Sequence, residues 1–72
     1  MDKFFGFQNT VENCYTYINT DNIIVINKRV YTLNGKVISQ AQVFVEFGKS
    51  AKEYILDEDQ YERLMKKIAD DK

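Results

Sequence analysis

The chain has 72 residues, of which 44% are hydrophobic and 14% aromatic, and its formal net charge is −1. This length and composition predict one globular domain near the lower size limit for a self-sufficient core, and they exclude a disordered chain. The sequence contains no histidine, which removes the commonest metal ligand and the easiest general base. Its only cysteine is Cys14, so an internal disulfide is excluded and a reducing compartment is favoured.

Residues 1–10 are rich in phenylalanine and contain no apolar stretch of signal-peptide or membrane-span length. We therefore expect a cytoplasmic protein whose N-terminus is an aromatic arm. The arm has two interpretations: its phenylalanines fill an uncovered side of the domain, or they insert into a partner protein. The residues concerned are Phe4, Phe5 and Phe7.

Residues 11–56 have the pattern of an antiparallel sheet. Residues 14–18 and 23–26 read as strands on either side of a polar turn. Asn34-Gly35 between two apolar runs predicts a type I′ hairpin, and the alternation over residues 40–47 predicts a half-buried strand. A last strand over residues 51–56 leads directly into the C-terminal helix.

Residues 57–69 predict a helix, with residues 70–72 as a frayed tail. Asp57 and Gln60 have the spacing of a capping box. The apolar residues that follow recur on one helical face and should pack against Val43, Val45 and either Ile23 or Ile24; they are Tyr61, Leu64, Met65 and Ile68. The predicted fold is α+β: a small antiparallel sheet of four to five strands with one C-terminal helix on one face.

The predicted sheet has more apolar surface than one helix can cover. Residues 23–26 are apolar on both faces, and Tyr15 and Tyr17 add aromatic surface. Phe44 stands alone among polar residues on its strand face and is the best single candidate for a contact residue. The second face must be covered by the N-terminal arm, by curling of the sheet, or by another chain, including a second copy of this one.

Three motifs that resemble catalytic or ligand sites fail at specific positions. Gly48-Lys49-Ser50 lacks the upstream glycine of a phosphate loop, because that position is Val43. The acids after Asp57 lack the glycine of a calcium loop, because that position is Glu62. Cys14 has no histidine to activate it, and we expect it to be buried as a small apolar residue.

The cations of the sheet region allow a nucleic-acid interpretation, in which they surround a tyrosine stacking platform. The competing interpretation is that they protect exposed edges and turns, and the lack of a basic excess favours it. These residues are Lys28, Arg29, Lys36, Lys49 and Lys52.

The sequence therefore favours a small non-enzymatic regulator or inhibitor that binds another protein stoichiometrically through a sheet face or edge. A homodimer is one form in which it could do so. The candidate contact residues are Phe44, Phe4, Phe5, Phe7, Tyr15 and Tyr17. The chain is rich in Asn, Ile, Lys and Tyr, whose codons are AT-rich, and this composition suits a phage or a low-GC bacterium. The alternatives are a nucleic-acid-binding module and a sponge or sensor for a small anionic ligand at a subunit interface.

Overall fold

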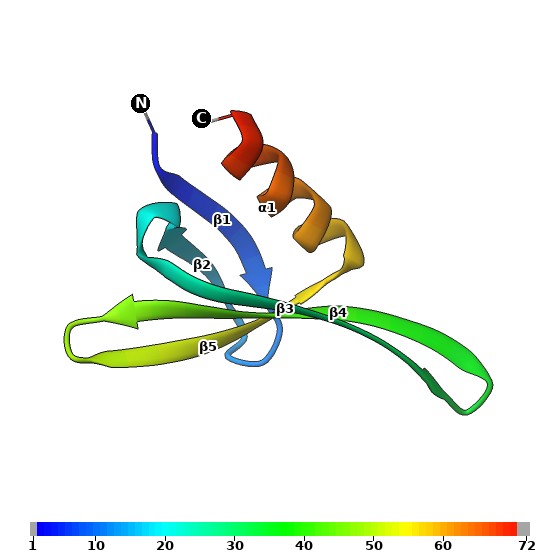
Figure 1. The fold of residues 1–72 in the computed structure, drawn as a ribbon. Coiled ribbons are helices and arrows are strands. Elements are labelled where there is room, and N and C mark those ends of the chain that lie inside the picture. Colours follow the sequence, from blue (N-terminus) through cyan, green and yellow to red (C-terminus); the bar gives the residue numbers. More distant parts are fainter. Residues whose placement is uncertain (1, 71–72) are drawn as a thin grey trace.

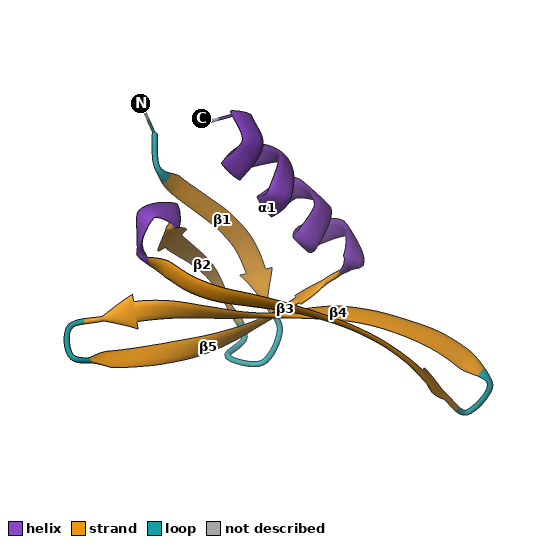
Figure 2. Cartoon of the chain, in the orientation of Figure 1, coloured by secondary structure: helices purple, strands orange, loops and turns teal. Residues whose placement is uncertain are grey.

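The computed structural model describes residues 2–70 and shows an α+β fold (Figure 1). Two antiparallel sheets are present, a β1–β2 hairpin and a β3–β4–β5 meander, and a single α-helix follows them (Figure 2). In chain order the elements are β1 (Phe4–Asn9), β2 (Cys14–Asn19), the 3₁₀ turn η1 (Thr20–Asn22), β3 (Ile23–Leu33), β4 (Lys36–Phe47), β5 (Ser50–Asp57) and α1 (Glu58–Asp70). An antiparallel α+β fold with one C-terminal helix was expected, whereas the strand at Phe4–Asn9 and the division into two sheets were not.

The N-terminal segment is a strand rather than an arm. Phe5 pairs with Ile18 and Phe7 pairs with Thr16, so both phenylalanines point to the inner side of the β1–β2 hairpin. Both are buried, and their rings stack with centroids 5.9 Å apart. The Phe7 ring also meets the Tyr54 ring edge-on, which joins the hairpin to the three-stranded sheet.

The two turns of the β3–β4–β5 sheet have backbone conformations that suit their residue types. Asn34 and Gly35 have φ values of 51° and 77°, which is the type I′ geometry expected for a two-residue Asn-Gly loop. Gly48 has a φ of 62° at the first position of the β4–β5 loop. A register shift between Ile23 and Val25 places Ile24 in a bulge of β3. Ile24 is therefore exposed, and Ile23 is the residue that packs against the core.

Helix α1 begins with the predicted capping box. The Gln60 backbone N–H donates to Asp57 Oδ1 over 2.8 Å, and the Asp57 N–H donates to Gln60 Oε1 over 3.0 Å. The Gln60 amide also donates to the Gln8 carbonyl oxygen over 2.9 Å, so this buried side chain ties the start of the helix to β1. Leu64 is fully buried and Tyr61 and Ile68 pack against the core, whereas Met65 points away and is partly exposed.

The core lies on one side of the three-stranded sheet, where the helix and the β1–β2 hairpin both sit (Figure 1). Its buried members come from all five elements that surround it: Phe5, Phe7, Ile18, Ala41, Val43, Val45, Leu56 and Leu64. The N-terminal phenylalanines therefore fill the helix side of the sheet and leave the second face open. Cys14 is exposed, contrary to the expectation of burial, because it lies beside the β1–β2 turn. Within residues 2–70, no helix is long and apolar enough to cross a membrane.

Candidate interaction surface

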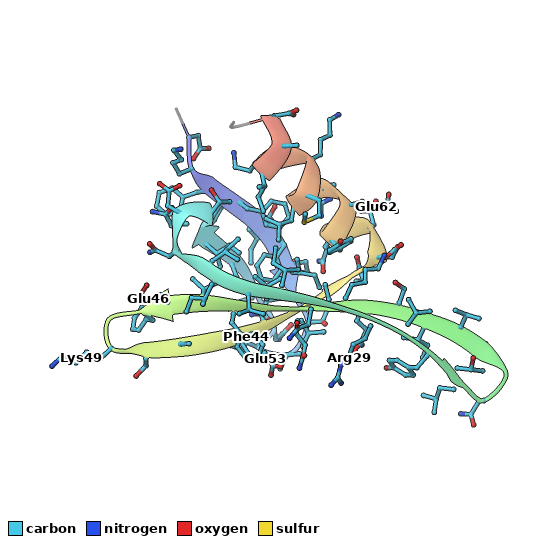
Figure 3. All side chains as sticks on the ribbon, viewed as in Figure 1. Arg29, Phe44, Glu46, Lys49, Glu53 and Glu62 are labelled. Carbon is cyan, nitrogen blue, oxygen red and sulfur yellow. The ribbon has the colours of Figure 1, made fainter. Side chains whose placement is uncertain are left out.

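The side of the three-stranded sheet that faces away from the helix carries a continuous row of partly exposed side chains. Residues paired directly across antiparallel strands point to the same side, so Val25, Phe44 and Glu53 share this side. Figure 3 shows Phe44, Glu53 and Arg29 below the sheet, opposite the helix. We call this surface the open face; its residues are Val25, Asn27, Arg29, Tyr31, Leu33, Lys36, Ile38, Gln40, Gln42, Phe44, Glu46, Ala51, Glu53 and Ile55.

The open face continues onto a two-stranded ribbon that extends beyond the body of the domain (Figure 1). Strand β5 ends its pairing with β4 at Gln40, so residues 30–39 have no third strand beside them. We call residues 30–39 the projecting ribbon. It is apolar on both sides, because Val30 and Val37 point to one side and Tyr31 and Leu33 to the other, with exposures between 40% and 74%. A hairpin of this kind is marginally stable without a partner surface.

Charge is segregated between residues 22–45, which make up most of the β3–β4 hairpin, and the rest of the chain. Residues 22–45 contain Lys28, Arg29 and Lys36 and no Asp or Glu, which gives +3 for this segment and −4 for the remaining residues. Among residues 2–70, no carboxylate lies within ion-pair distance of Arg29 or Lys36. The hairpin therefore presents apolar side chains together with two cations, Arg29 and Lys36, that have no ion-pair partner in the described part of the chain.

One carboxylate of the body does contact the base of this hairpin. Lys28 Nζ lies 2.8 Å from Glu58 Oε2, and the Ser39 hydroxyl donates to the same oxygen over 2.8 Å. Lys28 also lies over the Tyr61 ring, 4.5 Å from its centroid. The hydrogen bonds from Lys28 and Ser39 lower the pKa of Glu58, and the bond to Glu58 raises the pKa of Lys28. These contacts join the start of helix α1 to the point where the ribbon leaves the body.

Glu58 is expected to make stability depend on pH in the acid range. Because its pKa is lower in the folded chain than its ordinary value of 4.5, its contribution is present above that value and is lost as the pH falls through the folded pKa. We expect Glu58→Gln to flatten this part of the profile, measured by urea denaturation across the acid range. Ser39→Ala removes one of the two hydrogen bonds that lower the pKa of Glu58 and should flatten the profile in the same direction. Equal profiles for wild type and Glu58→Gln would contradict the assignment.

The aromatic candidates from the sequence are divided between three places. Phe5 and Phe7 belong to the core, and Phe44 lies on the open face. Phe4, Tyr15 and Tyr17 are exposed on the outer side of the β1–β2 hairpin. There the two tyrosine rings lie over Gly6, where any Cβ would come within 2.8 Å of each ring. The two tyrosine rings therefore pack over the backbone of Gly6, and this packing explains their position without a binding partner.

The five basic candidates do not form one patch. Lys36 begins β4 beside the β3–β4 turn, whereas Lys49 lies in the β4–β5 turn at the opposite end of the three-stranded sheet (Figure 3). Lys52 is paired with Glu12 at 2.9 Å, and this pair lowers the pKa of Glu12 and raises that of Lys52. Only Lys28, Arg29 and Lys36 share the β3–β4 hairpin.

Sequence reasoning missed two features that bear on the site. The absence of acids from residues 22–45 was readable in the sequence as a long gap between Asp21 and Glu46. The projecting ribbon could not be read in the same way, because it depends on where β5 stops pairing with β4.

The described part of the chain contains no group of three or more His, Cys, Asp and Glu side chains that could hold a metal ion. No known protein family, curated protein sequence or solved structure matches the chain.

Proposed function

We propose that this chain is a small non-enzymatic regulator that acts by binding protein, and that its contact surface is the open face together with the projecting ribbon. The observation that carries the proposal is the apolar character of the ribbon on both of its sides. Contiguous exposed apolar surface is uncommon on soluble monomers and is typical of interaction sites.

The composition of this surface supports a protein partner over a nucleic acid. A nucleic-acid footprint is dominated by cations that contact phosphates. Here the ribbon has Val30, Tyr31, Leu33 and Val37 exposed, and within residues 2–70 the neighbouring Arg29 and Lys36 have no ion-pair partner. The remaining basic candidates lie elsewhere or are paired with carboxylates. Burying these apolar side chains against a protein partner removes them from water, and the free energy gained in this way favours protein binding at this surface.

A photo-crosslinking residue placed in the ribbon tests the proposal in cells that express the chain. We expect benzoylphenylalanine at Tyr31 to yield adducts with protein, either a different protein or a second copy. Tyr17 is the matched control, because it is also an exposed strand tyrosine but lies on the outer side of the β1–β2 hairpin. It should give no adduct.

Two results would overturn the proposal. Adducts from Tyr17 and none from Tyr31 would show that the contact surface is on the β1–β2 hairpin and not on the projecting ribbon. Salt-dependent binding of a generic oligonucleotide, lost in Lys36→Glu, would assign the ribbon to nucleic acid instead.

A further inference from the structure

We propose that the open face binds a second copy of this chain, in a two-fold symmetric dimer whose axis passes beside Ala41 of β4. This inference rests on the proposed function, since it names the occupant of the same surface. Two sheets that pack face to face keep their strands roughly aligned. For two identical faces, two symmetric arrangements satisfy this condition, and the charges of the face distinguish between them.

Lys36 and Glu46 of the open face lie toward opposite ends of β4. Glu53 is also toward the β4–β5 turn, whereas Arg29 is paired with Gln40 near the middle of the sheet. An axis parallel to the strands would place Lys36 of each copy against Lys36 of the other. An axis perpendicular to the strands reverses the ends, so that Lys36 of each copy meets Glu46 of the other, while Arg29 faces Asn27.

The reversed arrangement fixes a register along β4. Lys36 lies opposite Glu46 when the axis crosses β4 midway between them, which is the level of Ala41. The same axis places Ile38 opposite Phe44 of the second copy, and Gln40 opposite its Gln42. On β3 it brings Tyr31 over Val25 of the second copy. The apolar ribbon of each copy therefore covers Val25 and Phe44 of the other copy, toward the β4–β5 turn of its open face.

The β3–β4 hairpin supplies most of the buried area, because β5 of one copy lies mainly opposite the projecting ribbon of the other, where there is no third strand. With a rise of about 3.3 Å per residue and a strand spacing of about 4.8 Å, this hairpin has a planar footprint of about 300 Å² per copy. Side-chain relief raises the area that the two copies bury above twice this footprint, toward the roughly 1,000 Å² that a specific interface requires. Of the twelve large hydrophobic residues that are exposed within residues 2–70, Val25, Tyr31 and Leu33 lie on the open face.

Pairing through the free edge of β3 is the other way to join two copies, and the sequence of that edge disfavours it. Lys28 and Arg29 lie near the middle of β3, so two β3 strands paired about that point would bring like charges together. The bulge at Ile24 also interrupts the edge. Packing of the open faces avoids both problems.

Charge reversal tests the dimer and its register on the purified chain. We expect the wild type to sediment as a dimer in analytical ultracentrifugation. Lys36→Glu and Glu46→Lys should each weaken dimerisation at least about tenfold, because each reversal creates two like-charge contacts across the axis. Lys49→Glu, in the β4–β5 turn and outside the paired positions, is the control and should leave dimerisation unchanged. Circular dichroism should show the same fold for all variants, since these side chains are exposed.

Mixing the two single variants gives the decisive result. In the mixture, Glu at position 36 faces Lys at position 46 on one side of the axis, and the native Glu46 and Lys36 meet on the other. We therefore expect equimolar Lys36→Glu and Glu46→Lys to form a heterodimer with the affinity of the wild type. Failure of the mixture to associate, or single variants that dimerise as the wild type does, would overturn the register.

A wild-type chain that stays monomeric up to about 1 mM would overturn the dimer itself. That result is distinguishable from failure of the proposed function, because an adduct between Tyr31 and a different protein would still support protein binding by the ribbon. Loss of both the dimer and the Tyr31 adduct would remove both proposals.

Discussion

Replacement of Phe7 by alanine is expected to unfold most of the protein. The Phe7 side chain is 1% exposed and contacts both the Phe5 ring and the edge of the Tyr54 ring. Truncation of a buried phenylalanine costs about 3–5 kcal/mol. A single core in a domain of this size rarely supplies more than about 3–5 kcal/mol of stability. Circular dichroism with urea denaturation should show loss of the native transition.

Phe4→Ala is the matched control for this prediction. Phe4 is on the same strand but points to the other side, and it is 53% exposed. Its truncation should change the free energy of unfolding by about 1 kcal/mol or less. Equal destabilisation by the two substitutions would show that the hairpin does not bury its inner side as described.

The second large effect is expected for Leu64→Ala in helix α1. Leu64 is fully buried between the helix and the sheet, so its truncation leaves a cavity in the core. The expected cost is about 2–5 kcal/mol, measured as a shift in the urea midpoint with the slope unchanged.

Met65→Ala tests whether this cost comes from burial rather than from the helix itself. Met65 is the next residue along the helix, is 37% exposed, and lies outside the core cluster. We expect it to cost about 1 kcal/mol or less, since alanine also has the higher helix propensity. A larger effect at Met65 than at Leu64 would mean that the helix packs in a different rotation.

Both predictions depend on the small number of buried apolar side chains that stabilise this domain. The core is supplied by a few side chains from the hairpin, the sheet and the helix, and it lies on one side of the sheet only. The apolar residues of the open face and the ribbon contribute little to it. This distribution is the physical basis for proposing that a second surface completes the burial.

Local signals predicted the elements well because each element depends on a few neighbouring residues. The capping box of Asp57 and Gln60 predicted the start of helix α1, and the two hydrogen bonds between these residues confirm it. Asn34-Gly35 predicted the β3–β4 turn, and its positive φ values confirm the type I′ geometry. The periodicity of residues 40–47 predicted the buried side of β4, where Ala41, Val43 and Val45 all lie in the core.

Predictions that needed the relative positions of elements were less successful. Residues 1–10 read as an arm because Phe4, Phe5 and Phe7 were counted together, although alternation in a strand separates Phe4 from the other two. Met65 was placed in the core because it shares a broad helical face with Leu64, whereas the helix rotation buries only one of them. Cys14 was expected inside because free cysteines are often buried, but a residue beside a turn has little around it to cover it.

By itself, the sequence determined the fold class, the start of the helix and the β3–β4 turn, and its lack of histidine limits the catalytic and metal chemistry that the chain can support. These properties depend on residue types and short-range spacing. Only the tertiary structure decided that the hairpin and the helix share one side of the sheet, and that β5 stops at the level of Gln40. Those two facts depend on long-range packing and strand length, and together they create the open face and the projecting ribbon.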